Sequence, residues 1–320
     1  MTVMITGAGL LATHAAKALV DAGHAVLFYD VTPSEPYIRL IMEDRPFMLE
    51  RGDVLDLPQM LHAIDRHGVT GMVHTAAFLP ETARDRPFMA TRVTVEGTVN
   101  TLEAHRLAKL GRYALCSTIG IYEMASSSTA PWEEDRAIGP DTFYGCLKLS
   151  AEVIALHYQK AYGVDVVAPR FCPVYGLGQW YASAGAMFMA TCVEGPALGK
   201  RVLIDKPFTN TNQYMYVEDA ARAIVLCYTV RNPAERAINI SAGALHTAPQ
   251  VIDAVKAVIP GAQVDITPEA WAASKDRRFV DQPFSLKRAN AVLGFSPRLT
   301  LEASIAHYAG QVRRRAQQVR

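Results

Sequence analysis

A tyrosine and a lysine four residues apart, Tyr144 and Lys148, are the side chains of this chain whose types and spacing best suit chemistry. Residues at i and i+4 lie on one face of a helix, one turn from each other. An ammonium group beside a phenol favours the phenolate, which predicts a pKa for Tyr144 below its ordinary value of about 10. A phenol of that kind acts as a general base or acid for the proton of an alcohol. The spacing also fits a simple helix surface pair, so its meaning depends on the rest of the chain.

A glycine-rich segment near the start, Thr6-Gly7-Ala8-Gly9-Leu10-Leu11-Ala12, follows one apolar run and opens a helical pattern. Gly7 and Gly9 permit a tight turn and the close approach of a pyrophosphate, which the helix N-terminus then stabilises. Asp30 ends the second apolar run, where a carboxylate accepts hydrogen bonds from the ribose hydroxyls of NAD and repels the 2′-phosphate of NADP. These residues favour NAD, and the alternative is that Asp30 is only a turn residue at a strand end.

The elements that must position these residues alternate along the first half of the chain. Continuous apolar runs predict six strands, at Val3–Thr6, Ala25–Tyr29, Phe47–Glu50, Gly71–His74, Tyr113–Cys116 and Val164–Ala168. Helical periodicity predicts four helices between them, at Leu10–Ala22, Leu57–His67, Thr91–Lys109 and Phe143–Tyr162. The alternation predicts an α/β fold, with a doubly wound parallel sheet covered by helices on both faces.

The rhythm breaks after Arg170. Val174–Tyr181 and Leu198–Asn212 are rich in Gly, Pro, Asn and Thr, while one more helix and strand are expected at Val217–Tyr228 and Ala237–Ile240. We therefore expect a nucleotide-binding domain at 1–174, to which 213–241 return, and a smaller, interleaved substrate-binding lobe at 175–212 and 242–320.

Composition narrows the class of protein. The 320 residues are 50% hydrophobic and carry a formal net charge of +1, which gives no reason to expect nucleic acid or a membrane surface as the partner. The five cysteines show no C-x-x-C pair, which suits a reducing cytoplasm. No apolar run approaches the ~20 residues of a spanning helix. Because the histidines lack ligand spacing, no metal is implied.

Nearly the whole chain resembles the extended short-chain dehydrogenases/reductases, a family that includes the NAD-dependent epimerase/dehydratase group. Besides the glycine loop, Asp30, Tyr144 and Lys148, the resemblance rests on further ordered segments: Gly52-Asp53-Val54, His74-Thr75-Ala76-Ala77, Thr94–Thr98, Ser117–Tyr122, Glu134-Asp135, Pro169-Arg170, Val174-Tyr175-Gly176, Tyr216–Ala220 and Leu293–Pro297. It implies a Rossmann-type fold and NAD as the cofactor.

The resemblance also implies roles for individual residues. Thr118 matches the catalytic hydroxyl that holds the reacting oxygen, with Ser117 as the fallback; Tyr144 matches the proton-transfer phenol, and Lys148 the group that binds the nicotinamide ribose and lowers the phenol pKa. The expected cofactor-binding residues are Gly7, Gly9, Leu10, Leu11, Asp30, Asp53, Val54, Thr75, Ala76, Ala77, Tyr144, Lys148, Phe171 and Val174. The expected substrate-binding residues are Leu79, Thr118, Ile119, Gly120, Tyr144, Cys172, Trp180 and Tyr181.

Departures from the family pattern bear on the reaction. Dehydratases of the family have Asp-Glu after the catalytic Thr, where this chain has Ile119 and Gly120, neither of which moves a proton. Nucleotide-sugar epimerases usually have an Asn and an Arg near the diphosphate at the positions of Pro173 and Asn212. Arg278 is one candidate to replace the missing charge, as are Arg201 and Lys206.

Three functions follow from these departures. The leading one is an NAD-dependent dehydrogenase for a secondary alcohol of a small polyol, sugar acid or related hydroxy compound. The alternative is a sugar or nucleotide-sugar epimerase that acts through a transient keto intermediate. A binding protein with a dead site is disfavoured, because Thr118, Tyr144 and Lys148 are all present.

The resemblance further implies a homodimer in which the helices near Thr91–Lys109 and Phe143–Tyr162 pair with their symmetry mates as a four-helix bundle. Small and apolar residues on these helices are expected to form the contact: Ala104, Leu107, Ala108, Ala151, Ile154 and Ala155.

Overall fold

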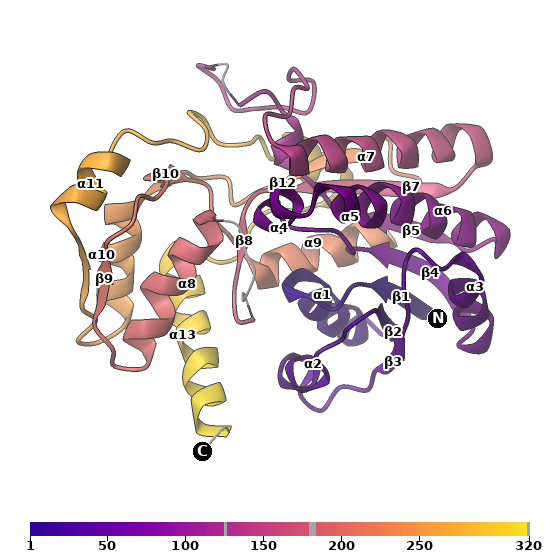
Figure 1. The fold of residues 1–320 in the computed structure, drawn as a ribbon, viewed down its shortest axis with the longest axis horizontal. Helices are drawn as coiled ribbons and strands as arrows, with labels where there is room; N and C mark the ends of the chain where they lie inside the picture. The colour runs from indigo at the N-terminus through magenta and orange to yellow at the C-terminus, as the bar shows by residue number, and fades with distance from the viewer. Residues whose placement is uncertain (125–126, 179–183, 319–320) are drawn as a thin grey trace.

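A parallel sheet forms the centre of the protein, which we describe from a computed structural model covering residues 1–124, 127–178 and 184–318 (Figure 1). From edge to edge the sheet contains β12 (Ala237–Ile240), β7 (Asp165–Phe171), β5 (Arg112–Leu115), β4 (Val69–His74), β1 (Thr2–Thr6), β2 (Ala25–Asp30) and β3 (Met48–Arg51), and the short β6 (Ser117–Thr118) also pairs with β7. The order reverses between β1 and β4, which is the point where open α/β sheets bind their ligands. The predicted doubly wound fold is confirmed.

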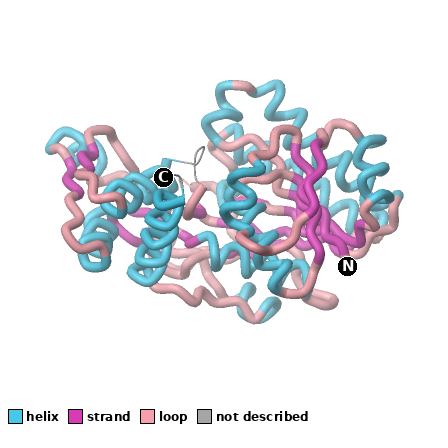
Figure 2. Tube along the Cα trace, turned by 90° about the horizontal axis from the view of Figure 1, so that it is seen from below, coloured by secondary structure: helices cyan, strands magenta, loops and turns pink. Residues whose placement is uncertain are grey.

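Helices cover both faces of the sheet (Figure 2). Alternate residues of β1 explain why: Val3 and Ile5 point into one apolar core, whereas Met4 points into the other. The first face carries α1 (Leu10–Asp21), α2 (Glu35–Met42) and α9 (Val217–Thr229), and the second carries α3 (Leu57–Arg66), α6 (Gly97–Leu107) and α7 (Phe143–Tyr162). The helix predicted at Phe143–Tyr162 has the predicted bounds.

The helix predicted at Thr91–Lys109 is built differently. Two short helices, α4 (Pro80–Asp85) and α5 (Pro87–Thr91), come first, each opened by a proline whose fixed φ suits the first helical position. A π-helical turn, η1 (Arg92–Glu96), then joins α5 to α6. Such turns are rare and frequently occur at functional sites, and periodicity alone does not reveal them.

A second lobe lies beside the sheet, on the left in Figure 1. Between the two segments predicted to be rich in Gly, Pro, Asn and Thr, Val174–Tyr181 and Leu198–Asn212, the lobe contains an apolar helix that was not predicted, α8 (Ala184–Ala197). The lobe also contains β9 (Val202–Ile204), β10 (Thr211–Asn212), β13 (His246–Thr247), α10 (Ala248–Val258), β14 (Val264–Ile266), α11 (Pro268–Ser274) and α13 (Leu301–Gln318). The remaining elements are η2 (Ile119–Ile121), β8 (Val174–Tyr175), β11 (Met215–Tyr216) and α12 (Lys287–Leu293).

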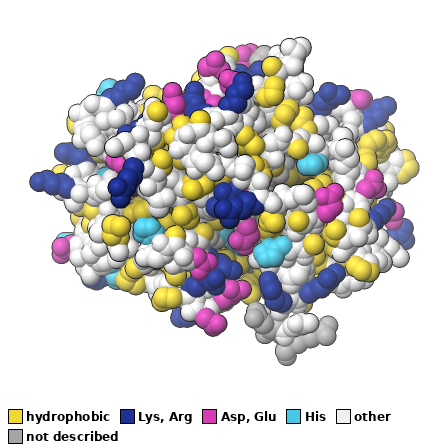
Figure 3. Space-filling view, turned by 180° about the vertical axis from the view of Figure 1, so that it is seen from behind, with side chains coloured by type: hydrophobic (Ala, Val, Ile, Leu, Met, Phe, Trp, Pro, Cys, Tyr) yellow, Lys and Arg dark blue, Asp and Glu magenta, His cyan; other side chains and the backbone are white. Residues whose placement is uncertain are grey.

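The lobe has its own apolar core, in which residues of α8, α10 and α13 pack together and against Tyr37 and Ile41 of α2. On the face shown in Figure 3, cationic and anionic side chains are interspersed rather than gathered by sign. Among the helices that the structure describes, none is long and apolar enough to cross a membrane.

Candidate active site

The structure brings the three predicted catalytic side chains together at the carboxyl edge of the sheet. Thr118 ends β6, and its hydroxyl accepts a hydrogen bond from the Gly120 amide (3.1 Å) and makes another with the Tyr144 side chain. Lys148, one helical turn after Tyr144, donates from Nζ to the carbonyl of Cys116 at 2.5 Å. The helix that carries Tyr144 and Lys148 is therefore joined to the strand end at two points, Thr118 and Cys116.

The pKa of Tyr144 does not follow the prediction. Burial raises the pKa of this phenol to about 12, although the hydrogen bond with Thr118 opposes the rise. The ammonium group of Lys148 donates to a backbone carbonyl rather than to the phenol, and burial lowers the pKa of Lys148 itself. Without a bound cofactor, the phenol is protonated at neutral pH.

A glycine next to the catalytic tyrosine permits the close approach of α7 to the loop after β6. Thr142 caps the helix by accepting a hydrogen bond from the Gly145 amide (3.1 Å). A Cβ atom on Gly145 would lie 2.3 Å from the carbonyl oxygen of Gly120 and 2.8 Å from Cβ of Pro140. Only glycine fits this contact.

The glycine loop is shaped to receive a dinucleotide. Gly7 has φ +89°, and a Cβ atom there would lie 2.7 Å from Oγ1 of Thr75. The carboxylate of Asp30 faces the loop, since one oxygen accepts a hydrogen bond from the Ala8 amide and the other from the Thr32 amide, both at 2.8 Å. The ends of β1, β2 and β4 thus meet at a backbone cradle that a side chain at residue 7 would fill, which fits a bound pyrophosphate.

The other expected cofactor-binding residues border this cradle or the same sheet edge. Backbone contacts hold two of them, since the Tyr29 hydroxyl donates to the Asp53 carbonyl (3.3 Å) and the Asn100 amide donates to the Val54 carbonyl (3.0 Å). Of the remaining ones, Leu10 and Leu11 open α1, Thr75, Ala76 and Ala77 follow β4, Phe171 ends β7 and Val174 begins β8.

The expected substrate side is only partly described. Leu79 precedes α4 and is 39% exposed, whereas the side chains of Ile119 and Cys172 are packed in the core and are 1% and 2% exposed. Contact of these two residues with a substrate would have to be made by their backbone. A Cβ atom on Gly120 would lie 3.5 Å from Oγ1 of Thr118, so this position adjoins the catalytic hydroxyl. Trp180 and Tyr181 lie outside the described residues.

Asn212, a neutral residue, stands where the resemblance to the family predicts a diphosphate-binding Arg. Asn212 is 2% exposed, and its side-chain oxygen accepts a hydrogen bond from the Gln213 amide (2.8 Å). Arg278 lies beside it, because its backbone forms a bridge with Thr211. Arg201 forms a surface ion pair with Asp265 (3.0 Å).

Three buried polar residues, Ser117, Glu152 and Arg170, lie behind the predicted catalytic group, and of these only Ser117 was predicted to have a role, as the fallback for Thr118. The carboxylate of Glu152 accepts hydrogen bonds from the Ser117 hydroxyl (2.5 Å) and from the guanidinium group of Arg170 (2.6 and 3.1 Å). The spacing Tyr144, Lys148, Glu152 places a third polar residue on the same face of the helix, and this was the available signal.

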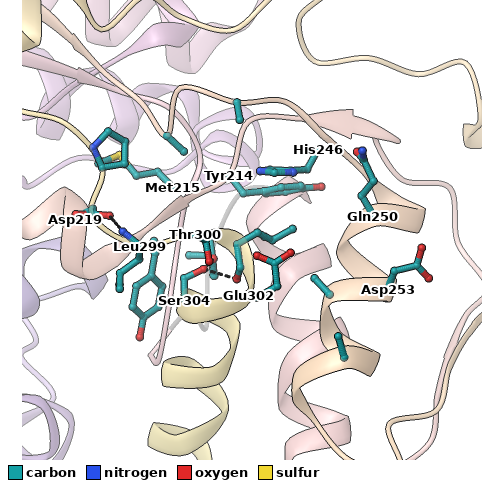
Figure 4. A pocket seen from close by; sticks show the side chains of 18 residues that line it. Tyr214, Met215, Asp219, His246, Gln250, Asp253, Leu299, Thr300, Glu302 and Ser304 are labelled. Atoms are coloured by element: carbon teal, nitrogen blue, oxygen red, sulfur yellow. Dashed lines mark hydrogen bonds between the residues drawn. The ribbon is translucent and has the colours of Figure 1, made fainter.

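A separate hollow of about 610 Å³ lies in the second lobe, between α10, the start of α13 and residues 214–219 (Figure 4). Its acidic residues are Asp219, Asp253 and Glu302, and Asp219 already accepts hydrogen bonds from the backbone amides of Arg298 and Leu299. None of the three predicted catalytic residues lines it. Across the described part of the chain, no group of three or more His, Cys, Asp or Glu is placed to hold a metal ion.

One family model and several known proteins match this chain. Residues 3–241 match the model of the NAD dependent epimerase/dehydratase family. A dTDP-glucose 4,6-dehydratase of Streptomyces niveus is 28% identical over 240 residues, which are 71% of this chain and 68% of that protein.

Two solved structures share the fold over almost their whole length. A UDP-glucose 4-epimerase of Thermus thermophilus, in complex with NAD, has a TM-score of 0.81 and 24% identity and covers 98% of this chain and 99% of its own. An L-threonine dehydrogenase of Cupriavidus necator in its holo form has a TM-score of 0.83 and 21% identity, with coverage of 98% and 100%. At these identities the likeness concerns the fold alone.

Proposed function

The chain belongs to the NAD dependent epimerase/dehydratase family, and on that premise we propose that it is a dehydrogenase that oxidises a secondary alcohol. Its cofactor is NAD, which when bound supplies the acceptor for the hydride. The proposed substrate is a small polyol, sugar acid or related hydroxy compound.

The observation that carries the proposal is the contact between Thr118 and Tyr144 beside the buried Lys148. In the proposed reaction the Thr118 hydroxyl holds the substrate oxygen, and Tyr144, ionised, accepts the proton from the substrate alcohol as the C–H bond gives up its hydride. Lys148 places a positive charge near the nicotinamide ribose. In the reverse direction Tyr144 returns the proton to the carbonyl oxygen.

Dehydration is disfavoured by the residues that follow Thr118. Expulsion of water needs an acid and a base close to the substrate, and Gly120 occupies a position 3.5 Å from the catalytic hydroxyl, measured from where a Cβ atom would be. Glycine has no group to move a proton, and Ile119 is packed in the core. Although the Streptomyces relative is named a dehydratase, this chain lacks that pair.

A small substrate is supported by the neutral residues Pro173 and Asn212. A diphosphate taken out of water needs charge-assisted partners, frequently a bidentate Arg. Pro173 and Asn212 stand where the family's diphosphate-binding residues lie, and the Asn212 side chain is buried and turned toward its own backbone neighbour.

The alternative is an epimerase that oxidises a sugar carbon and returns the hydride to the other face. Its support is Arg278, whose backbone forms a bridge with Thr211, the residue before Asn212, so that an arginine follows the same short strand segment. The likeness in fold to the Thermus epimerase is compatible with this reaction, just as the likeness to the threonine dehydrogenase is compatible with the first.

Two measurements on the intact protein distinguish the proposals. A panel of polyols, sugar acids, hydroxy acids and nucleotide sugars is incubated with NAD, and NADH absorbance and product configuration are both followed. We expect NADH to accumulate with a non-nucleotide alcohol. Calorimetric titration of the NAD-bound protein with UDP, TDP and GDP is the second test. Micromolar binding of a nucleotide, with inversion and no net NADH, would replace the dehydrogenase by the epimerase.

The proposal extends to the domains of the chain and to its assembly. Residues 1–174 with 213–241 would bind NAD, and residues 175–212 with 242–320 would bind the substrate. We further propose a cytoplasmic homodimer assembled through α6 and α7.

A further inference from the structure

A buried polar group lies directly behind the catalytic residues and has no part in the proton transfer. It consists of Ser117 on β6, Glu152 on α7 and Arg170 on β7, which are 4%, 1% and 7% exposed. Both carboxylate oxygens of Glu152 are used: one by the Ser117 hydroxyl at 2.5 Å and the Arg170 Nε at 3.1 Å, the other by the Arg170 Nη2 at 2.6 Å. Arg170 also donates to the Tyr122 hydroxyl at 2.5 Å.

Stability is a weak explanation for this arrangement. Burying two charges costs several kcal/mol per ion in lost hydration, and well-packed apolar residues can replace such pairs with little loss of stability. The surroundings would accept apolar side chains, since Ala155 and Ala168 nearby belong to one apolar core and Phe171 to the other. An ion pair supplies something that packing does not, which is a fixed direction for each hydrogen bond.

The hydrogen bonds of this group act on the strand end that carries the Thr118 hydroxyl. Three consecutive residues at the end of the strand each attach to α7: the Cys116 carbonyl to Lys148, the Ser117 hydroxyl to Glu152 and the Thr118 hydroxyl to Tyr144. Their partners are spaced four residues apart along one face of the helix. Arg170 pairs with Ser117 in the sheet register, so its guanidinium group ties the same strand end to its neighbour.

We propose that Glu152, held by Arg170, is a positioning residue that sets the Thr118 hydroxyl against Tyr144 through its hydrogen bond to Ser117. The proposal rests on the proposed function, because it assumes that Thr118 and Tyr144 carry out the reaction. Without the central attachment, the strand end can shift along the helix. A displacement of about 1 Å at a reacting group lowers turnover by up to ~10²-fold.

The direct test is Ser117→Ala, which removes one hydrogen bond and leaves the Glu152–Arg170 pair in place. We expect kcat to fall about tenfold or more, the dissociation constant for NAD to stay within twofold, and the pH profile to keep its midpoint. The matched control is Thr101→Val, which removes an equally buried hydroxyl bonded to Tyr113 at 2.7 Å. The control is expected to lose similar thermal stability and to keep the wild-type kcat.

Glu152→Gln separates the charge from the hydrogen bond. The amide still offers an oxygen to Ser117 but leaves the Arg170 charge unpaired. The added positive potential favours the phenolate of Tyr144, so the acid limb of the kcat profile is expected to move to lower pH, which Ser117→Ala does not cause. A loss of stability alone would not move that limb. A folded Glu152→Gln variant with both wild-type kcat and a wild-type pH profile would overturn the positioning role of Glu152.

The outcomes distinguish this inference from the proposed function. If Tyr144→Phe is inactive while Ser117→Ala keeps wild-type kcat, the function stands and the positioning role is wrong. If the wild-type protein shows neither NADH formation nor product inversion, a crystal structure of Ser117→Ala decides the positioning role without a substrate. An unchanged separation of the Thr118 and Tyr144 oxygens in that structure would overturn it.

Discussion

At the scale of single residues, Tyr144, the proposed catalytic tyrosine, lies in surroundings that oppose its ionisation. Burial raises the pKa of Tyr144 to about 12, and the adjoining ammonium group of Lys148 is hydrogen-bonded to a carbonyl oxygen. The hydrogen bond with Thr118 favours the phenolate but does not offset the burial. Proton abstraction therefore has to be prepared by bound ligands or by a rise in pH.

The raised pKa of Tyr144 makes the direction of the reaction depend on pH. Alcohol oxidation needs the phenolate, whose population increases as pH rises toward the raised pKa, so we expect the oxidation rate to increase steadily between about pH 7 and pH 10. Carbonyl reduction needs the neutral phenol, which already predominates, and should change little over that range. Steady-state rates in both directions measure this. Tyr144→Phe should lower kcat by at least ~10²-fold and abolish the difference in pH dependence between oxidation and reduction. An equal pH response of the wild-type protein in both directions would contradict the role of Tyr144 as the proton-transfer group.

The carboxylate of Asp30 should decide between NAD and NADP. Asp30→Asn keeps an oxygen for the hydrogen bond from Ala8 but removes the charge that repels a 2′-phosphate. We expect the ratio of NADP to NAD dissociation constants, measured by fluorescence titration, to fall by about tenfold. Asp21→Asn, a carboxylate paired with Arg45 at the surface, is the control and should keep the wild-type ratio. Equal affinities for the two cofactors in the unmodified protein would refute the role of Asp30.

At the scale of elements, the start of α7 determines how close the phenol comes to the strand end. The helix begins at Phe143 behind the Thr142 cap, and its third residue is the glycine that touches the loop after β6. The position of Tyr144 thus depends on a backbone contact as much as on its own side chain.

Replacing two helical glycines, Gly145 and Gly310, by alanine should change the stability of the protein in opposite directions. Gly145→Ala places a methyl group 2.3 Å from the Gly120 carbonyl oxygen, so the helix must move. We expect a loss of stability and a fall in kcat of about tenfold or more. Gly310→Ala, in α13, meets nothing within 4 Å and should stabilise the protein by up to ~1 kcal/mol through helix propensity. Thermal unfolding with kinetics checks both, and normal kcat in Gly145→Ala would show that the contact can relax.

The sequence was sufficient for the fold class and for most of the elements of its first half. The expected strands and the helix of Tyr144 are present because apolar runs and helical periodicity report burial directly. The π-helical turn before α6 and the raised pKa of Tyr144 were not predictable, since each depends on contacts between distant segments. The same holds for Glu152, whose partner Arg170 comes from another element. Residue types predicted that Thr118, Tyr144 and Lys148 form one group, and the structure brings them together, whereas the contacts around them required the structure.

At the scale of the whole molecule, the residues predicted for a dimer contact need correction. Ala104, Ala151 and Ala155 are fully buried in the core of their own chain and cannot meet a partner. Apolar side chains that do face outward on these helices include Val153 of α7 and Leu107 of α6, which are 57% and 50% exposed; Phe143 and Tyr162, at the two ends of α7, are 42% and 58% exposed. If α6 and α7 form an interface, these residues are its apolar part.

A charge on this surface should therefore change the assembly. We expect the wild-type protein to sediment as a dimer at micromolar concentration, and Val153→Asp to sediment as a monomer because an unpaired carboxylate is costly in an apolar contact. Leu203→Asp is the matched control, because Leu203 of β9 is also 57% exposed but belongs to the other lobe. A monomeric wild-type protein, or a Leu203→Asp variant that dissociates equally, would contradict the predicted interface.

The return of β12 to the sheet has a consequence for how the protein is made. Its partner β7 ends at Phe171, but β12 begins only at Ala237, after α8 and α9 have been synthesised. A ribosome adding ~5–20 residues per second leaves the outer edge of β7 unpaired for several seconds. Unpaired strand edges template association with other chains. Nascent chains arrested before residue 237 should thus recruit chaperones and aggregate more readily than chains released after β12 has paired.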